Sequence, residues 1–88
     1  FTPLDACQIP TGEIRSVLGS PFDFRKLKRI GQDINTIDEQ LTFGNGYDHN
    51  FIINQNNIEA NSLAMAARVE ESVYGRSMEV FTNAPGIQ

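Results

Sequence analysis

Short apolar runs separated by turn-forming residues dominate this sequence. The β-branched and aromatic residues of segment 47–54 predict one strand, segment 78–82 predicts a second, and segment 13–18 predicts a weaker third. The polar residues 55–62 predict a loop. Glycine or proline marks the turns, namely Pro10-Thr11-Gly12, Gly19-Ser20-Pro21, Gly44-Asn45-Gly46, Tyr74-Gly75-Arg76 and Ala84-Pro85-Gly86. This spacing of turns is typical of an all-β protein.

Segment 63–73 carries two conflicting patterns. Its Ala, Met, Arg and Glu residues are strong helix formers, and Ser62 stands where a helix N-cap would be. Its apolar side chains nevertheless alternate, as in a half-buried strand, at Leu63, Met65, Ala67 and Val69. The neighbouring segments are turn-bounded strands, and the family resemblance described below also implies a strand here, so we predict a strand.

The composition is typical of a folded protein and argues against two classes of binding partner. Its 88 residues, 40% of them hydrophobic, suffice for one small domain, and no repeat or linker predicts a boundary within residues 1–88. The net charge of −4 argues against a nucleic-acid or anionic-membrane binder, which is normally basic. Five of the seven basic residues nevertheless fall between Arg15 and Arg29. This run is either a phosphate-binding patch or a solvated loop balanced by acidic residues, and we favour the loop.

The reactive side chains exclude several kinds of site. Cys7 is the only cysteine and His49 the only histidine, so the sequence offers no intrachain disulfide and no cluster of His and Cys metal ligands. Gly44 and Gly46 begin like a dinucleotide fingerprint, but His49 occupies the place of its third glycine. We therefore expect no metal and no cofactor. The lone cysteine favours a reducing compartment, although exported proteins without disulfides share this feature, and we expect a cytoplasmic protein. Residues 1–88 contain no secretory signal and no apolar run of the roughly 20 residues that span a bilayer.

Three polar side chains that could bind a ligand lie close together in one short segment, Gly46-Tyr47-Asp48-His49-Asn50-Phe51. In an extended strand Asp48 and Asn50 share one face, while His49 and the two aromatic rings share the other. A carboxylate beside an amide suits a carbohydrate site, because it accepts two sugar hydroxyls while apolar rings cover the C–H face of the sugar. Taken alone, the residues favour a simpler interpretation, in which Asp48 and Asn50 bond turn backbone and His49 is an ordinary half-buried residue.

A set of motifs follows a fixed order along the whole chain. The motifs are Pro10-Thr11-Gly12-Glu13-Ile14, Gly19-Ser20-Pro21-Phe22-Asp23-Phe24-Arg25, Ile30-Gly31, Gly46-Tyr47-Asp48-His49-Asn50-Phe51, Gly75-Arg76-Ser77-Met78-Glu79-Val80 and Pro85-Gly86-Ile87-Gln88. In this order they resemble the aldose 1-epimerase (galactose mutarotase) family, with departures at Cys7, Ser20 and Ile87 and in a longer Asn-rich loop around residues 54–62. The resemblance implies a large antiparallel β-sandwich, of which residues 1–88 form an interior slice.

The resemblance also implies a cofactor-free sugar isomerase. In the implied mechanism a carboxylate base takes the proton of the anomeric hydroxyl, a histidine acid protonates the ring oxygen, and the opened ring recloses from its other face. The implied substrate is a free aldohexose such as galactose or glucose. Two alternatives stay open, a non-catalytic sugar-binding relative and a phosphosugar epimerase of the same fold, whose phosphate the basic run would bind.

The resemblance assigns two substrate-binding residues within this chain. Asp48 matches the aspartate that hydrogen-bonds sugar hydroxyls, and Gln88 matches the glutamine of a Pro-Gly-Val-Gln block that lines the same pocket. The catalytic histidine and glutamate of the family are expected upstream and downstream of these residues, so we expect no catalytic residue in this chain and no activity from it alone. We expect His49 to be structural and to support the strand that aims Asp48. No feature of the sequence predicts an oligomeric state.

Overall fold

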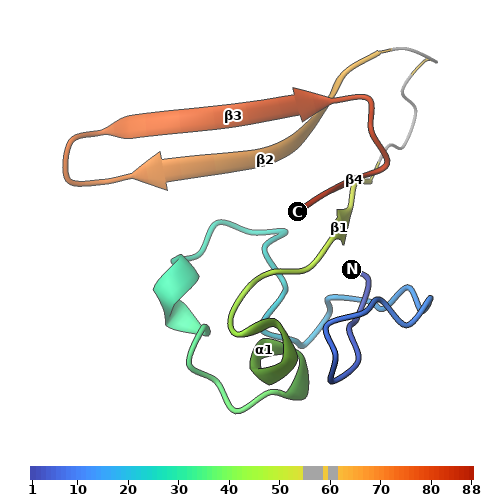
Figure 1. The fold of residues 1–88 in the computed structure, drawn as a ribbon. Helices are drawn as coiled ribbons and strands as arrows, with labels where there is room; N and C mark the ends of the chain where they lie inside the picture. Colours follow the sequence, from blue (N-terminus) through green and yellow to red (C-terminus); the bar gives the residue numbers. More distant parts are fainter. Residues whose placement is uncertain (55–58, 60–61) are drawn as a thin grey trace. The chain divides into compact units, whose positions relative to one another are not determined.

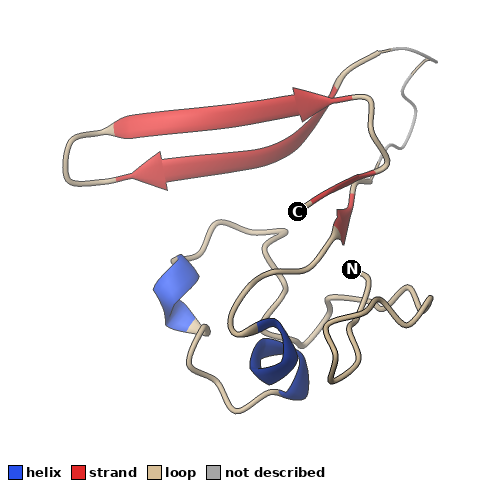
Figure 2. Ribbon diagram, viewed as in Figure 1, coloured by secondary structure: helices blue, strands red, loops and turns tan. Residues whose placement is uncertain are grey.

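The computed structural model describes residues 1–54, 59 and 62–88. In chain order its elements are the 3-10 helix η1 (Ile30–Gln32), the helix α1 (Glu39–Gly44) and the strands β1 (Phe51–Ile52), β2 (Ala64–Glu71), β3 (Arg76–Thr82) and β4 (Gly86–Ile87). The strands form two two-stranded sheets, β1 with β4 and β2 with β3 (Figure 1, Figure 2). No helix in the described part of the chain is long and apolar enough to cross a membrane.

The described chain divides into two compact units. The first, here called the loop unit, comprises Phe1–Phe51 and Gln88, and the second, the hairpin unit, comprises Ile52–Ile87. Each is near or below the roughly 50 residues of the smallest ordinary domains. A single domain over residues 1–88 therefore stays a prediction.

The hairpin unit is built on the antiparallel pair of β2 and β3 (Figure 1). Arg68 lies opposite Glu79, and their side chains approach to 3.7 Å between Nη1 and Oε1, which places opposite charges across the pair. The backbone groups of β2 bond to β3 instead of closing helical turns. The predicted strand over residues 63–73 is thereby confirmed against its helical alternative, and the predicted strand over residues 78–82 is confirmed within β3.

A β-bulge interrupts the alternation on which β2 was predicted. Met65 lies opposite Phe81, whereas Ala67 lies opposite Val80, so β2 has one extra residue between these pairs. A shift of one residue moves a side chain to the other face of a sheet. Met65 and Ala67 therefore do not share a face, and the apolar stripe predicted from the alternation is broken in the structure.

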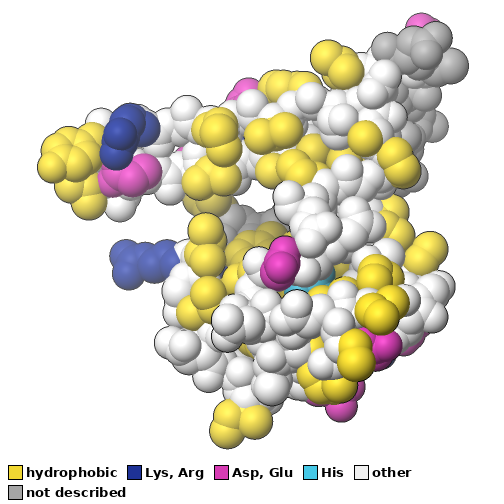
Figure 3. Space-filling view, in the orientation of Figure 1, with side chains coloured by type: hydrophobic (Ala, Val, Ile, Leu, Met, Phe, Trp, Pro, Cys, Tyr) yellow, Lys and Arg dark blue, Asp and Glu magenta, His cyan; other side chains and the backbone are white. Residues whose placement is uncertain are grey.

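The hairpin has little core of its own. Figure 3 shows hydrophobic side chains spread along it at the surface. The exposed fractions of Met65, Val69, Met78 and Phe81 lie between 43% and 57%, and those of Val73 and Tyr74 in the turn are 78% and 80%. Ala64 is the one buried apolar residue among those described in this unit. Strand pairing, not a local core, therefore orders the hairpin.

The core of the loop unit is aromatic. Phe22 is 1% exposed and stacks on Phe1, with 4.5 Å between ring centroids. Tyr47 and His49 meet the ring of Phe22 edge-on, at 5.4 and 4.6 Å between centroids. Edge and stacked pairs of this kind each stabilise by about 0.5–1.5 kcal/mol beyond the area that they bury. A unit that is mostly loop in Figure 2 thus packs around one phenylalanine.

Helix α1 was not predicted from the sequence. Asp38 caps it, because its Oδ1 accepts the backbone N–H groups of Gln40 and Leu41 at 2.8 and 3.1 Å. The helix ends at Gly44, and the cap residue Asn45 that follows has a left-handed backbone (φ 53°). The N–H of Gly46 donates to the carbonyl of Leu41. Asn45-Gly46 is therefore a helix C-terminal cap, and its interpretation as a plain turn before a strand was incomplete.

The strand predicted over residues 13–18 is wrong. These residues are all described and none lies in a strand. Ile14 and Leu18 are 72% and 73% exposed. The N–H and C=O of Arg15 bond to the backbone of Phe1, at 2.8 Å each, and this single pair of bonds does not continue as a ladder.

The strand predicted over residues 47–54 is shorter than expected. Only Phe51–Ile52 forms a strand, β1. The preceding residues are extended but are held by side chains and by the aromatic core, so no ladder forms there.

The loop predicted at residues 55–62 lies largely outside the described residues; within it, the N–H of Ser62 donates to the carbonyl of Glu59.

Candidate functional site

The chain leading into β1 sends alternate side chains into the core and toward the surface. Within this segment, the side chains that contact Phe22 are those of Tyr47, His49 and Phe51. Asp48 and Asn50 instead line a surface hollow. The predicted division of this segment between two faces is confirmed, because extended backbone alternates its side chains even where no ladder forms.

Asp48 and Gln88 meet, although they are 40 residues apart in the sequence. The amide Nε2 of Gln88 donates to Oδ1 of Asp48 at 2.9 Å. Among the described residues this is the one side-chain hydrogen bond to that carboxylate, and Asp48 forms no ion pair with any of them. One amide thus orients the carboxylate, while lone pairs of both oxygens stay available to a ligand.

The hollow beside Asp48 is small and polar. Its volume is about 230 Å³, and it is lined by Thr2, Leu4, Gln8, Pro10, Asp48, Asn50 and Gln88. Ordinary ligand pockets measure roughly 300–1,000 Å³, so this hollow is the size of part of such a pocket. Its amides, carboxylate and hydroxyl can both donate to and accept from sugar hydroxyls.

No aromatic ring among the described residues lines this hollow. Leu4 and Pro10 supply its apolar surface. The rings of Tyr47 and Phe51 pack in the core around Phe22 and do not contribute to this hollow.

Buried hydrogen bonds hold the backbone that carries Asp48. His49 is 1% exposed, its Nδ1 accepts the backbone N–H of Asp48 at 3.3 Å, and its Nε2 lies 3.2 Å from Oε1 of Gln40. Because Nδ1 is the acceptor, Nε2 carries the proton and donates it to Gln40. Gln40 bonds both backbone groups of Leu4, accepting its N–H at 2.7 Å and donating to its carbonyl at 2.9 Å.

The surroundings of His49 favour the neutral imidazole. Burial lowers the pKa of His49, and the negative charges of Asp48 and Asp38 oppose that shift without reversing it. Both ring nitrogens are engaged in the core, and His49 does not line the hollow. The expectation that His49 sits beneath Asp48, and not in the site, agrees with this placement.

Gly44 makes room for the imidazole. A Cβ atom at position 44 would lie 2.6 Å from Cε1 of His49, closer than side-chain contacts allow. Gln40 and Gly44 are four residues apart in α1, so they share the helix face that meets His49. Sequence analysis missed both residues, although the i, i+4 relation would have paired them once Asp38 had been recognised as a helix cap.

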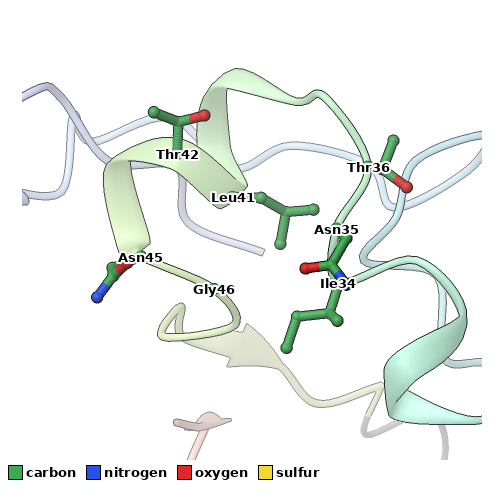
Figure 4. A pocket seen from close by; sticks show the side chains of 7 residues that line it. All are labelled: Ile34, Asn35, Thr36, Leu41, Thr42, Asn45 and Gly46. Carbon is green, nitrogen blue, oxygen red and sulfur yellow. The ribbon is translucent and has the colours of Figure 1, made fainter.

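A second hollow, of about 390 Å³, lies against α1 (Figure 4). It is lined by Ile34, Asn35, Thr36, Leu41, Thr42, Asn45 and Gly46. Figure 4 shows the apolar side chains of Ile34 and Leu41 pointing toward the same space. None of its lining side chains can transfer a proton near neutral pH, and none belongs to the predicted site. This hollow is therefore not the candidate active site.

Three of the five basic residues between Arg15 and Arg29, namely Arg15, Arg25 and Lys28, are paired with acidic residues. Arg25 donates to both carboxylate oxygens of Asp23, at 2.8 and 2.7 Å, and this pairing lowers the pKa of Asp23 to about 2. The ammonium of Lys28 lies 2.7 Å from Oδ2 of Asp33. These pairs support the interpretation as a balanced, solvated loop over that of a phosphate-binding patch.

Comparison with known proteins assigns the chain to a family. The family described as Aldose 1-epimerase matches residues 1–88. The chain belongs to the aldose 1-epimerase family. Over all 88 residues it is 40% identical to a galactose mutarotase of Bos taurus, 38% to one of Homo sapiens and 32% to an aldose 1-epimerase of Escherichia coli (strain K12). The chain spans only 23%, 23% and 24% of these relatives, and no solved structure matches it.

Membership of the aldose 1-epimerase family confirms the resemblance inferred from the ordered motifs. The predicted all-β class agrees with the structure, because β2 and β3 form the one long element pair and α1 has only six residues. Exposed apolar side chains along the hairpin are consistent with a slice of a β-sandwich. The site roles of Asp48 and Gln88 stay predictions, which the geometry above makes specific.

Proposed function

We propose that the protein to which this chain belongs is an aldose 1-epimerase, or mutarotase. It would interconvert the α and β anomers of free aldohexoses such as galactose or glucose by acid–base ring opening. One observation carries this proposal. In a chain that matches the aldose 1-epimerase family throughout, Asp48 and Gln88 are joined at 2.9 Å beside a hollow lined by further amides.

In this proposal Asp48 and Gln88 bind and orient the sugar. The amide of Gln88 takes one lone pair of Oδ1, which fixes the carboxylate plane and leaves acceptor positions for two sugar hydroxyls. Asn50 and Thr2 border the same hollow and supply donors and acceptors for further hydroxyls. Holding the pyranose in one orientation speeds proton transfer, because the reacting atoms then meet the acid and the base without a further loss of freedom.

The proton transfers themselves are proposed to lie with residues outside this chain. His49 is not a candidate acid, since its ring is buried and both nitrogens are bonded within the core. The family resemblance supplies the acid and the base as a histidine and a glutamate in segments beyond these 88 residues. We accordingly propose that the 88 residues alone do not accelerate mutarotation.

The lone Cys7 supports a reducing compartment, and we propose the cytoplasm.

Polarimetry of freshly dissolved α-D-glucose and α-D-galactose, with the intact protein, tests the activity directly. We expect an accelerated approach to the equilibrium rotation. For Asp48→Ala we expect kcat/KM to fall roughly 10- to 100-fold, since a hydrogen bond to a charged group contributes about 1.5–3 kcal/mol. Glu39→Gln removes an exposed carboxylate of the same unit outside the hollow, and we expect it to leave kcat/KM unchanged.

Each outcome of this experiment decides something different. An intact protein that binds hexose without changing the mutarotation rate would be a non-catalytic relative. Unchanged kcat/KM in Asp48→Ala would remove Asp48 from the site. Tighter inhibition by sugar phosphates than by free hexoses would favour a phosphosugar epimerase, against which the carboxylate partners of Arg25 and Lys28 already argue.

A further inference from the structure

We propose that Gln40 and His49 are positioning residues, which fix the place of Asp48 relative to Leu4 in the lining of the hollow. Gln40 holds the backbone of Leu4 on one side and the imidazole of His49 on the other, and His49 holds the backbone of Asp48. Leu4 and Asp48 both line the hollow. The proposal deepens the proposed function, and it rests on the sugar-binding role of Asp48.

The burial of these two polar side chains requires an explanation. Gln40 is 4% exposed and His49 is 1% exposed, in a core that is otherwise apolar and aromatic. Burying an amide or an imidazole costs free energy unless its hydrogen bonds are made, and an apolar residue of similar shape would fill the space without that cost. Among the described residues no buried side-chain nitrogen or oxygen lacks a partner. A fully bonded polar network of this kind fixes one geometry, which apolar packing does not.

The orientation of the imidazole is set from several sides. Its ring meets Phe22 edge-on at 4.6 Å and Phe1 edge-on at 5.8 Å between centroids. Gly44 of α1 faces the ring, and because an added Cβ would lie 2.6 Å from Cε1, no other residue type fits there without moving the ring. Rotating the ring by a half turn would put carbon atoms where Nδ1 and Nε2 now bond, so the hydrogen bonds to Asp48 and Gln40 would both be lost.

The network therefore ties two separate segments together at the hollow. Gln40 bonds both backbone groups of Leu4, which also forms an isolated β-bridge with Pro10. Its further bond to His49 carries the constraint to Asp48. C-terminal to Asp48 in the sequence, the backbone carbonyl of Asn50 accepts the backbone N–H of Thr2 at 3.0 Å. Asp48 thus projects from a backbone that is fixed on both sides, although it lies in no strand.

The first test needs no variant. In the intact protein at pH 7, 15N NMR of His49 should show a neutral imidazole with the proton on Nε2 and Nδ1 unprotonated. The proton on Nδ1, or an imidazolium with both nitrogens protonated, would overturn the proposal, because Nδ1 could then not accept the N–H of Asp48. This result does not depend on whether the protein is a mutarotase.

The second test asks whether Gln40 acts through Asp48. Gln40→Leu should lower kcat/KM for mutarotation roughly 10- to 100-fold, mainly by raising KM. The reason is that the carboxylate of Asp48 would be displaced and would no longer hold the sugar in one orientation. The matched control is Leu41→Val, on the same helix and equally buried, which should lower stability while kcat/KM per folded molecule stays the same. In an Asp48→Ala background, Gln40→Leu should have no further effect on kcat/KM.

The outcomes separate this proposal from the proposed function. If Gln40→Leu lowers kcat/KM by the same factor in the wild-type and the Asp48→Ala backgrounds, the positioning role is overturned. It is also overturned if Gln40→Leu changes kcat/KM in neither background. If the intact protein shows no mutarotation, the proposed function fails, and the NMR signals decide the positioning role alone. Gln40→Leu should then still shift the backbone amide signal of Asp48, and an unmoved signal would overturn the proposal.

Discussion

The loop unit and the hairpin unit reach an ordered structure by different means. In the hairpin, the backbone bonds of β2 and β3 satisfy each other, yet the large apolar side chains stay exposed. In the loop unit few backbone groups belong to a ladder, yet Phe22, Leu41 and His49 are buried. Regular secondary structure and a packed core are thus separate properties in this chain, and the candidate site lies with the core.

The loop unit depends on individual side chains to satisfy its backbone. Asp38 caps α1, Gln40 bonds both backbone groups of Leu4, and the hydroxyl of Tyr47 donates to the carbonyl of Pro21 at 2.8 Å. Buried backbone groups need such partners wherever no strand supplies them. Single substitutions in the loop unit should therefore cost more stability than substitutions in the hairpin unit, and the predictions below test that difference.

The largest effect is expected at the centre of the aromatic core. Phe22→Ala should lower the free energy of unfolding of the intact protein by about 3–5 kcal/mol, because it removes a ring that is 1% exposed. Val73→Ala, at a residue of the hairpin turn that is 78% exposed, should change it by less than about 0.5 kcal/mol. Denaturant unfolding followed by circular dichroism measures both. Equal losses would remove the contrast between the units.

Adding a methyl group at Gly44 should have the next largest effect. Gly44→Ala should destabilise by about 1–3 kcal/mol, because the new Cβ would stand 2.6 Å from the imidazole of His49. The matched control is Gly31→Ala in η1, where nothing lies within 4 Å of the added atom, and we expect no loss of stability there. If the two variants unfold alike, the close packing of α1 on His49 is not as described.

Removing the helix cap should cost less. Asp38→Ala should destabilise by about 1 kcal/mol, because the N–H groups of Gln40 and Leu41 lose their acceptor. Asp38→Asn keeps a side-chain oxygen at the cap and should restore most of that stability. Thermal unfolding of the three proteins compares them, and an Asn variant as unstable as the Ala variant would contradict the capping role.

The smallest effect concerns an exposed ion pair. The guanidinium of Arg25 holds the pKa of Asp23 at about 2, below its ordinary 3.8. The stabilisation from this pair is present above pH 3.8 and is lost as the pH falls toward 2, since the folded carboxylate must then take up a proton. Arg25→Gln should move the pKa of Asp23 toward 3.8 in an NMR titration. An unmoved pKa would mean that another group depresses it.

The sequence predicted the hairpin better than the loop unit for a physical reason. A strand pair is encoded locally, in the runs on either side of Tyr74-Gly75-Arg76, so its elements are visible before any tertiary contact is known. Even there the choice between helix and strand for β2 depended on neighbours, because its own residues favour a helix. The bulge between Met65 and Ala67 has no local signature and could not be foreseen.

The loop unit was harder to predict because its order comes from contacts between distant residues. Helix α1 has six residues, too few to show an apolar period, although Asp38 carried the signal for its start. The faces of Asp48 and His49 followed from simple alternation. The pairing of Asp48 with Gln88 was expected only from the family resemblance, and the bonds from Gln40 to Leu4 join residues 36 apart, which no local pattern encodes.

The central claim is that Asp48, paired with Gln88, faces a bound sugar. A crystal structure of the intact protein with galactose tests it most directly. We predict a sugar hydroxyl oxygen within about 2.5–3.0 Å of a carboxylate oxygen of Asp48, with the bond from Gln88 retained. Galactose bound at another place, with the carboxylate of Asp48 open to solvent, would contradict the claim.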